Sequence, residues 1–418
     1  MIPRQITASL KRSLAQFPIV SLTGPRQSGK TTLLRNEFSD YSYVSLEDPD
    51  VRAFAQDDPR AFLALHANRV IFDEIQRVPE LFSYLQGQVD ETGAPGQYIL
   101  SGSQNFLLMD AISQSLAGRV AIRHLPPFSY CEVKAADRQP ESIEAWVVRG
   151  GYPRLYDVDM APEEYFPNYI QTYIDRDVRR ELGVVKIPEF NRFVALCATR
   201  IGNLVNLQSL AADCKINIRT AKDWLALLEQ SFIIRLLRPY HRNYGKRLIK
   251  TPKLYFEDTG LACSLLGIET AEDLLTSSYR GALFENAVVS EMTKETLSQG
   301  KVPDFYFWRD SAGREIDLIV DKAGTIQRAI EVKASSTYDP KSFSALDKLG
   351  DELGIPTSTR EVVYSGDVSM ETKHGLLCAF ADLSCSNSFI DSIPVANDFS
   401  SMTDEEIRQH KVKKLVEE

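Results

Sequence analysis

Eight residues near the start of the chain have the types and the spacing of a phosphate-binding loop. Two glycines let the backbone turn successive N–H groups toward an anion, Lys30 places a charge beside the β- and γ-phosphates, and the hydroxyl of Thr31 can ligate Mg²⁺. The apolar run 18–22 predicts a buried strand before the loop, and Thr32 begins an amphipathic helix whose N-terminus favours the same anion. These features predict a site for ATP or GTP, and the alternative is a surface turn that binds nothing. The loop consists of Gly24, Pro25, Arg26, Gln27, Ser28, Gly29, Lys30 and Thr31.

A second apolar run, 69–72, leads directly into Asp73 and Glu74. At the carboxyl end of a neighbouring parallel strand, Asp73 would hold Mg²⁺ and Glu74 would orient the attacking water. A third strand is expected at 97–100, followed by the polar segment 101–104. In that segment we expect Ser103 to contact the γ-phosphate, with Gln104 as the alternative. The simpler interpretations are an acidic turn and an ordinary turn. In this order along the chain, the three segments predict a hydrolase that uses ATP and Mg²⁺.

Further short segments carry a resemblance to a known family. They are Phe72-Asp73-Glu74-Ile75-Gln76, Leu100-Ser101-Gly102-Ser103, Leu116-Ala117-Gly118-Arg119, Pro126-Pro127-Phe128-Ser129 and Gly151-Tyr152-Pro153. With the loop 24–31, they resemble the AAA-type ATPases of bacteria and archaea, in which a poorly characterised C-terminal region follows the ATPase. The resemblance covers most of the chain and is most specific in its first third.

The resemblance has implications for three arginines. It implies that Arg119 is an arginine finger or a sensor, acting on a γ-phosphate that can belong to a neighbouring subunit of a homo-oligomer. The alternative for Arg119 is a surface ion pair. It also implies that Arg149 or Arg154, on either side of the Gly-x-Pro element, senses nucleotide, without choosing between them.

Length and composition indicate a multidomain globular protein. The 418 residues suggest about three domains, and the hydrophobic fraction of 44% and charged fraction of 25% are typical of globular chains. Because the chain has no long apolar run and no secretion signal, we expect a cytoplasmic protein with no membrane partner. The six cysteines form no C-x-x-C pair and the five histidines no ligand pair, which favours reduced, structural thiols.

The middle of the chain has the element order of a winged helix, which is helices followed by two strands. Asn217 is expected to cap the last helix, with Ile218 and Trp224 on its inner face. In a DNA-binding version, Arg219 and Lys222 would face the groove. Winged helices beside AAA modules also serve as lids or protein-contact domains, so this alternative stays open. The helices are expected at 193–201, 206–212 and 217–229, and the strands at 232–237 and 253–256.

A basic stretch follows the last of these helices. Between Gln230 and Glu257 there are seven basic residues and no acidic one, although the whole chain has a net charge of −9. Uncompensated charge of this kind favours contact with phosphate groups, so we expect the chain to bind nucleic acid, and DNA more than RNA. A hairpin over 242–250 would bind the phosphates of the nucleic acid through Arg242, Lys246, Arg247 and Lys250. The full set is Arg235, Arg238, Arg242, Lys246, Arg247, Lys250 and Lys253.

The last third contains acidic residues and a lysine in a pattern suited to phosphodiester cleavage. Glu331 and Lys333 are two residues apart on an expected strand, so they share a face and point toward Asp317 on the adjacent strand. Two carboxylates there can hold Mg²⁺, which polarises a phosphodiester and lowers the pKa of a bound water, while Lys333 positions that water. The expected elements are a helix at 281–289, strands at 304–308, 315–320 and 327–332, a helix at 342–353 and a strand at 361–364.

This helix and strand order, with its acidic residues, resembles the PD-(D/E)xK nucleases of the restriction-endonuclease-like fold. The resemblance implies that Glu285, on the preceding helix, is an accessory metal ligand. Glu315 shares the face of Asp317 and is a further candidate ligand, unless its neighbour Arg314 neutralises it. The proline of the family signature is absent, because Ile316 precedes Asp317.

Together these segments predict an α/β chain that begins with a parallel-sheet ATPase core of the AAA type. We expect the core at 1–150, a helical linker at 151–190, a winged-helix-like domain at 191–262, a nuclease-like domain at 263–390 and a polar tail at 391–418. ATP hydrolysis would then drive or permit Mg²⁺-dependent cleavage of nucleic acid by the last domain. The alternative is a nucleotide-dependent switch whose nuclease-like domain binds nucleic acid or protein without cutting. A third, weaker interpretation is a chaperone-like remodeller of protein partners.

Overall fold

The computed structural model describes residues 1–102, 115–172, 186–240 and 251–383. Several predicted site residues lie outside these ranges, and so does the tail 391–418. They are Ser103 with its alternative Gln104, and the basic residues Arg242, Lys246, Arg247 and Lys250.

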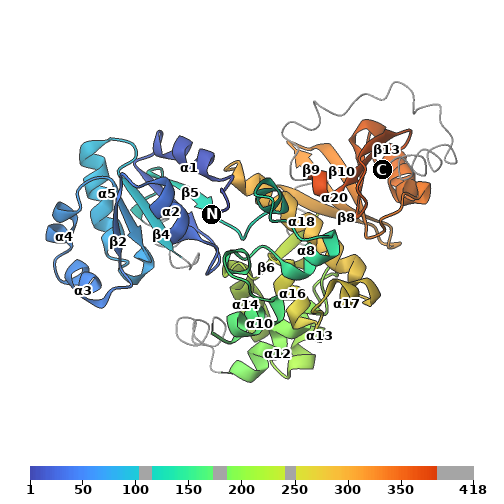
Figure 1. Cartoon of the computed structure of the whole chain (residues 1–418), viewed down its shortest axis with the longest axis horizontal. Helices are drawn as coiled ribbons and strands as arrows, with labels where there is room; N and C mark the ends of the chain where they lie inside the picture. The colour runs from blue at the N-terminus through green and yellow to red at the C-terminus, as the bar shows by residue number, and fades with distance from the viewer. Residues whose placement is uncertain (103–114, 173–185, 241–250, 384–418) are drawn as a thin grey trace.

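The first part of the chain forms a five-stranded parallel sheet with the order β2-β3-β4-β1-β5 (Figure 1). Every residue of β1, β3 and β4 is buried, which is typical of parallel strands that helices cover on both faces. Because β4 lies between β1 and β3, the strand that carries Asp73 is one place removed from β1, and the prediction that the two are neighbours is wrong. The strands are β1 (Ile19–Thr23), β2 (Ser42–Ser45), β3 (Val70–Asp73), β4 (Tyr98–Gly102) and β5 (Val120–His124).

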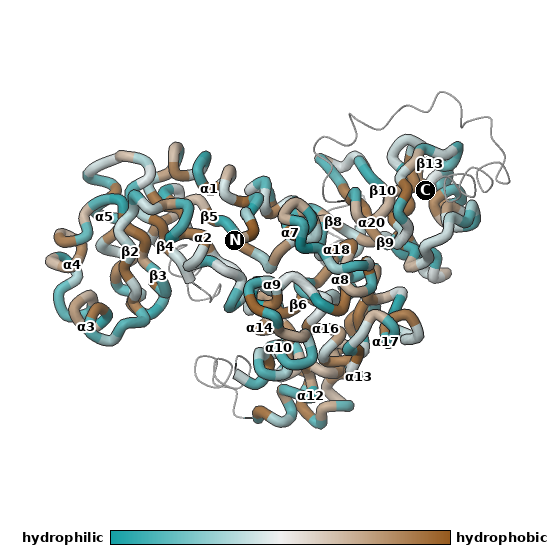
Figure 2. Tube along the Cα trace, viewed as in Figure 1, coloured by the Kyte–Doolittle hydropathy of each residue, from teal (hydrophilic) through white to brown (hydrophobic). Residues whose placement is uncertain are grey.

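Two apolar clusters cover the two faces of this sheet. Alternate residues of a strand point to opposite faces, so Ile71 of β3 packs with α1 and α2, whereas its neighbour Phe72 packs with α3, α4 and α5. Figure 2 shows the apolar character of β3 and β4. The helices are α1 (Thr7–Leu14), α2 (Lys30–Glu37), α3 (Pro49–Asp57), α4 (Pro59–Leu65), the 3-10 turn η1 (Ile75–Arg77) and α5 (Leu81–Thr92).

The middle part is mainly helical and ends in an antiparallel strand pair, β6 and β7. The side chain of Asn217 caps α14 by accepting from the amide of Thr220 at 2.7 Å, as the sequence predicts. Trp224 of α14 packs edge-on against the rings of Phe190 and Phe193. The elements are α7 (Tyr130–Ala135), α8 (Ile143–Arg149), α9 (Arg154–Asp157), α10 (Pro162–Tyr169), α12 (Ile187–Ala198), α13 (Leu207–Cys214), α14 (Ile218–Gln230), β6 (Ile234–Pro239), β7 (Lys253–Phe256), α16 (Thr259–Leu265) and α17 (Ala271–Thr276).

The last part contains the helix, three strands, helix and strand that the sequence predicts, followed by an unexpected pair of strands and a short helix. The long helix α18 lies between the N-terminal sheet and the last strands in Figure 1. The elements are α18 (Arg280–Ser298), β8 (Phe305–Arg309), β9 (Glu315–Lys322), β10 (Thr325–Lys333), η3 (Pro340–Phe343), α19 (Ser344–Leu353), η4 (Thr357–Thr359), β11 (Arg360–Tyr364), β12 (Met370–Thr372), β13 (Gly375–Ala379) and α20 (Phe380–Leu383).

One mixed sheet joins the middle and last parts, with the order β12-β13-β11-β10-β9-β8-β6-β7. Arg238 and Pro239 of β6 pair in parallel with β8. A single apolar cluster extends from Phe128 through α12, α14 and α18 to Leu383. The two parts therefore share a sheet and a core. In the described part of the chain, no helix is both long enough and apolar enough to cross a membrane.

Candidate functional site

The phosphate-binding loop follows β1 and leads into α2. Gly24 has a φ of 152°, and a Cβ at this position would lie 2.2 Å from the carbonyl oxygen of Leu125, so no larger residue fits. Gly29 has a φ of 89° and immediately precedes α2. Both glycines are therefore required by the backbone of the loop itself, as their spacing predicts.

Lys30 is buried inside the loop. Its ammonium donates to the carbonyl oxygens of Gly24 at 2.9 Å and Pro25 at 2.8 Å. Burial lowers the pKa of Lys30 to about 8, although the nearby carboxylates of Glu74 and Asp73 oppose this shift. A buried cation beside backbone amides fits an anionic ligand such as a triphosphate.

The hydroxyl of Ser28 adds a polar group to the same loop. It is buried and has no hydrogen-bond partner among the described residues. Buried hydroxyls are normally satisfied, so this atom is suited to contact a phosphate oxygen. Lys30 and Ser28 together support the fit of the loop to a nucleotide.

The carboxylate of Asp73, at the end of β3, accepts hydrogen bonds from two hydroxyl groups. Its Oδ2 accepts from the hydroxyls of Thr31 and Tyr43, each at 2.7 Å. A threonine hydroxyl beside a buried carboxylate is a donor set that fits Mg²⁺ at a phosphate-binding loop. Tyr43, on β2, was not predicted, because nothing in its local pattern distinguishes it from an ordinary strand tyrosine.

Glu74 directly follows β3 in the left-handed conformation, with a φ of 54°. Burial raises its pKa, and the side-chain amide of Gln76 donates to its carboxylate at 2.5 Å. Ser101, at the end of β4 between Leu22 and Asp73, has a buried hydroxyl with no hydrogen-bond partner in the described part of the chain. The end of β4 therefore presents a polar group to the site, although Ser103 lies outside the described residues.

Two residues from other parts of the chain contact the phosphate-binding loop. The guanidinium of Arg4 donates to the carbonyl oxygen of Ser28 at 2.9 Å and pairs with Glu132 at 3.2 Å. The hydroxyl of Tyr165, on α10, donates to the side-chain oxygen of Gln27 at 2.8 Å. Sequence reasoning missed both, because each reaches the loop only through the tertiary fold.

Arg149 and Arg154 have different surroundings. Arg149 donates to the carbonyl oxygen of Leu155 at 2.5 Å, and its guanidinium lies over the Tyr156 ring, 5.3 Å from the centroid. Arg154 is exposed and directly follows Pro153, whose Cγ would lie 3.6 Å from a Cβ on Gly29. Arg154 is therefore the better placed of the two to sense nucleotide.

Arg119 lies at the opposite edge of the sheet from the phosphate-binding loop. Its carbonyl oxygen accepts from the amide of Ile19, the first residue of β1, whereas the loop follows Thr23 at the other end. A five-residue strand spans about 16 Å. The guanidinium makes a two-point ion pair with Asp90, at 2.5 and 2.8 Å. The prediction that Arg119 senses the chain's own nucleotide is therefore wrong, while a role toward a neighbouring subunit stays a prediction.

A second group of charged residues lies in the last part of the chain. Glu285 comes from α18, Glu315 and Asp317 from one face of β9, and Glu331 and Lys333 from β10. One carboxylate oxygen each of Glu285, Glu315 and Asp317 lies within 4.8 Å of the others. We call the four carboxylates Glu285, Glu315, Asp317 and Glu331 the acidic centre.

Burial controls the electrostatics of the acidic centre. It raises the pKa of Asp317 well above its usual range, and the charges of Glu285 and Glu331 add to the shift. The ammonium of Lys333 donates to Oε1 of Glu331 at 2.6 Å, and the amide of Val332 donates to Asp317 at 2.9 Å. The other oxygen of Glu331, Oε2, is buried and has no hydrogen-bond partner among the described residues. Clustered carboxylates with an unsatisfied oxygen fit a divalent cation such as Mg²⁺.

Two basic side chains contact Glu315, and neither of them is Arg314. Arg314 pairs instead with Glu352 at 2.6 and 2.9 Å. Glu315 pairs with Lys253 and, at 3.4 Å, with Arg309. The prediction that Arg314 neutralises Glu315 is therefore wrong, because the guanidinium of Arg314 is bound to Asp310 and Glu352.

Lys253 contacts the acidic centre and is not part of an exposed basic surface. Its side chain is 3% exposed, and its ammonium donates to Oε1 of Glu285 at 2.8 Å. Arg235, also in the basic stretch, pairs with Glu257 at 2.8 Å. The prediction of seven uncompensated charges is therefore wrong for these two residues.

Two of the predicted nucleic-acid contacts are described, Arg219 and Lys222, and both are exposed on α14. Their contact with nucleic acid stays a prediction. Ile218 of the same helix is 50% exposed, so its predicted place on the inner face is wrong. It is the first residue of α14, and the buried face begins one turn later with Ala221.

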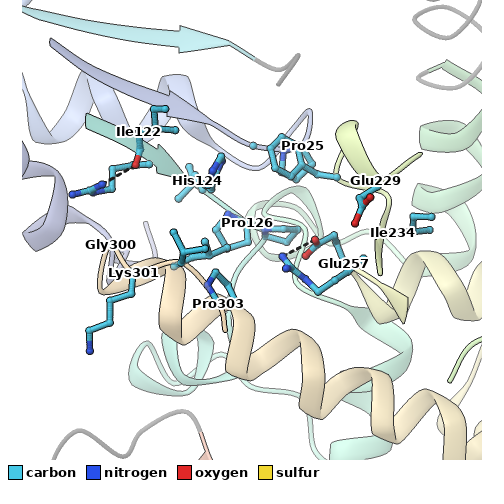
Figure 3. Close-up of a pocket in the computed structure, with 18 residues that line it drawn as sticks. Pro25, Ile122, His124, Pro126, Glu229, Ile234, Glu257, Gly300, Lys301 and Pro303 are labelled. Carbon is cyan, nitrogen blue, oxygen red and sulfur yellow. Dashed lines mark hydrogen bonds and ion pairs between the residues drawn. The ribbon is translucent and has the colours of Figure 1, made fainter. Parts of the chain in front are cut away.

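A pocket of about 450 Å³ lies behind the phosphate-binding loop, where β5, β6 and the end of α18 meet (Figure 3). His124, on its wall, lies 2.5 Å from the Thr23 hydroxyl, and burial lowers its pKa to about 4. The ion pair of Arg235 and Glu257 lies on another wall. At this pocket, the start of the phosphate-binding loop lies close to residues of the middle and last parts of the chain.

Comparison with known proteins divides the chain into three matched segments. Residues 16–134 match a family model described as an AAA domain. Residues 140–272 match a domain of unknown function, DUF8612, and residues 280–382 match another, DUF4143.

Two curated relatives and one solved structure are similar to the chain over much of its length. The uncharacterised proteins Rv2008c of Mycobacterium tuberculosis and Mb2031c of Mycobacterium bovis are 34% identical to it over 343 residues, which is 80% of this chain and 74% of each relative. The Walker-type ATPase PABY2304 of Pyrococcus abyssi is 17% identical, with a TM-score of 0.45, over 64% of this chain and 96% of that chain.

Proposed function

We propose that this chain, which belongs to the family of the mycobacterial proteins Rv2008c and Mb2031c and carries an AAA-type ATPase domain at residues 16–134, couples ATP hydrolysis to Mg²⁺-dependent cleavage of nucleic acid. The first site would hydrolyse ATP, and the acidic centre would cut a phosphodiester. The exposed side of α14 would contact the nucleic-acid backbone. DNA is the preferred substrate of this proposal.

In the ATPase step, Lys30 would exchange its hydrogen bonds to the loop carbonyls for phosphate oxygens. Thr31 and Asp73 would hold Mg²⁺, which offsets negative charge on the β- and γ-phosphates when bound. Glu74, kept in place by Gln76 at 2.5 Å, would accept a hydrogen bond from the attacking water. Its raised pKa places this carboxylate closer to the pH range in which a general base works best.

In the cleavage step, the four carboxylates of the acidic centre would hold Mg²⁺, which polarises the phosphodiester and lowers the pKa of a bound water. Lys333 would orient this water or donate to the developing negative charge on phosphorus. Its ammonium lies on the same strand face as Glu331 and only 2.6 Å from that carboxylate. The observation that carries this proposal is the buried Oε2 of Glu331, near Lys333 and Asp317, which has no hydrogen-bond partner in the described part of the chain.

Incubation of the full-length protein with plasmid DNA, single-stranded DNA and RNA, in the presence of ATP and Mg²⁺ or Mn²⁺, tests the proposal. We expect one class of substrate to be cut by the wild type and not by Lys333→Ala. Lys322→Ala, on the exposed end of β9, is the matched control and should cut normally. If no substrate is cut, or if Lys333→Ala cuts as well as the wild type, the cleavage step is wrong.

A second candidate function is supported by the position of Lys253. Its ammonium contacts both Glu285 and Glu315 and thus occupies carboxylate oxygens that a metal would use. A centre held in this state would bind nucleic acid or protein without cutting, and the ATPase would switch that binding. Affinity for DNA that differs between ATP and ADP, with no cleavage, would support this switch, whereas equal affinities would contradict it.

A further inference from the structure

Lys253 reaches the acidic centre from a different part of the chain than the carboxylates do. It is the first residue of β7, within the segment 140–272, whereas Glu285, Glu315 and Asp317 lie within 280–382. Its ammonium is bonded to Glu285 at 2.8 Å and paired with Glu315, and its side chain is 3% exposed. The acidic centre is therefore paired with a buried cation that comes from a different segment than its carboxylates.

Strand β7 pairs with β6 and is also bonded to α18. The side chain of Asn286 accepts from the amide of Phe256 at 2.6 Å and donates to its carbonyl oxygen at 2.8 Å. The hydroxyl of Tyr255 donates to the same oxygen of Glu285 that Lys253 uses. Asn286 directly follows Glu285 on α18. The packing of β7 against α18 therefore also positions the ammonium of Lys253 beside Glu285.

A divalent cation and the ammonium of Lys253 would compete for the same carboxylates. The oxygens that lie within 4.8 Å of one another belong to Glu285, Glu315 and Asp317, and Lys253 contacts two of these three residues. Two cations so close in a buried site repel each other strongly. Lys333 is a different case, because it contacts Glu331 and leaves the Oε2 of that residue without a partner among the described residues.

We propose that Lys253 is a built-in competitor for divalent metal at the acidic centre, which binds metal tightly only when β7 moves its ammonium away from Glu285 and Glu315. The inference rests on the proposed metal-binding role of this centre. It makes the centre a site shared between two segments of the chain. Any change in the packing of β7 on α18 would therefore change its metal affinity.

Mn²⁺ binding to the full-length, nucleotide-free protein tests this inference without any activity measurement. Titration followed by electron paramagnetic resonance of free Mn²⁺ should show binding at least tenfold tighter in Lys253→Met than in the wild type. Adding Asp317→Asn to Lys253→Met should abolish the gain, which assigns it to the acidic centre. Lys322→Met, an exposed change on the same strand as Asp317, should bind Mn²⁺ as the wild type does.

Lys253→Gln provides a second neutral variant in case the methionine variant does not fold, because its amide keeps a donor for Glu285. Wild-type binding that is as tight as, or tighter than, that of the folded neutral variant would overturn the role of Lys253 and leave the metal site standing. Absence of Mn²⁺ binding in every protein would overturn both this inference and the proposed cleavage function. Tighter binding in the neutral variant that survives Asp317→Asn would place the metal elsewhere and also overturn the inference.

Discussion

The ammonium of Lys294 on α18 donates a hydrogen bond to the carbonyl oxygen of Phe128, 3.0 Å away, in the segment that leaves the ATPase sheet after β5. On the same helix, Glu291 accepts from the amide of Tyr130 at 2.7 Å and pairs with Lys294 at 2.9 Å. Glu285 of the acidic centre lies earlier on α18. One helix therefore contacts both the exit of the ATPase domain and the acidic centre, which provides a physical connection between the two candidate sites.

Lys294→Met should strongly destabilise the protein. Glu291 is 1% exposed, and loss of Lys294 leaves its charge without its partner in a buried position. Breaking such a buried pair costs about 3–5 kcal/mol. The midpoint of thermal unfolding should therefore fall by several degrees, whereas Lys301→Met, an exposed change just beyond α18, should leave it unchanged. Equal midpoints for Lys294→Met and the wild type would show that the pair does not hold α18 in place.

Glu74→Gln should separate nucleotide binding from hydrolysis. The amide cannot act as a base, so hydrolysis should fall by about 100-fold or more, while the contacts of Lys30 with phosphate remain. Steady-state phosphate release and the affinity for a fluorescent ATP analogue measure the two properties. Glu80→Gln, an exposed change just before α5, should retain both, and near-normal hydrolysis by Glu74→Gln would exclude Glu74 as the base.

Tyr43→Phe should weaken the response of the ATPase to Mg²⁺. The lost hydroxyl donates to Asp73 at 2.7 Å, and loss of such a supporting bond typically lowers metal affinity by about 10–100-fold. The Mg²⁺ concentration for half-maximal hydrolysis should rise by about tenfold, with a smaller change at saturation. Tyr41→Phe is the matched control, because the Tyr41 hydroxyl donates to Gly96 and not to Asp73. The same shift in both variants would contradict a specific role of Tyr43.

Nucleotide affinity should decrease above about pH 8, because burial lowers the pKa of Lys30 to about 8. The ammonium form binds phosphate, so above this pH the protein must take up a proton when ATP binds, and affinity falls. Calorimetric titration with a non-hydrolysable ATP analogue between pH 7 and 9.5 measures this dependence. Constant affinity across this range would show that Lys30 stays charged in the free protein.

The same lowered pKa has a consequence for stability. Between pH 8 and 10.5 the unfolded chain binds more protons at Lys30 than the folded chain does, so this residue makes stability rise with pH over that window. At neutral pH the buried charge opposes folding. Lys30→Met should therefore unfold at a higher temperature than the wild type in the absence of nucleotide, whereas the exposed change Lys11→Met should have no such effect. A lower unfolding temperature for Lys30→Met would contradict this cost of burial.

Arg154→Ala and Arg149→Ala should have different effects. Arg154 is exposed and directly follows Pro153 beside the loop, so its loss should lower ATP hydrolysis with little change in stability. Arg149 donates a hydrogen bond to the carbonyl oxygen of Leu155 and stacks over the ring of Tyr156, so its loss should lower the unfolding temperature. Hydrolysis that falls only in Arg149→Ala would reverse the assignment.

Local sequence patterns predicted much of the first sheet and the position of the phosphate-binding loop. The apolar runs before Gly24 and Asp73 form β1 and β3, and Asn217 caps α14, because burial periodicity and capping depend on residues close in sequence. The predicted neighbours β1 and β3 are separated by β4, and the pairing of β6 with β8 was not predicted. Pairing between distant strands leaves no local signal.

The sequence by itself determined which residues can do chemistry: the phosphate-binding loop with Lys30, the carboxylates at the end of β3, and the alternation that places Glu331 and Lys333 on one strand face. Only the tertiary structure decided their partners. It placed Arg119 far from the loop and brought Tyr43 to Asp73 and Lys253 to Glu285, 32 residues away. The physical reason is that a side chain's type and spacing follow from the chain, whereas the charge it meets depends on how separate helices and strands pack.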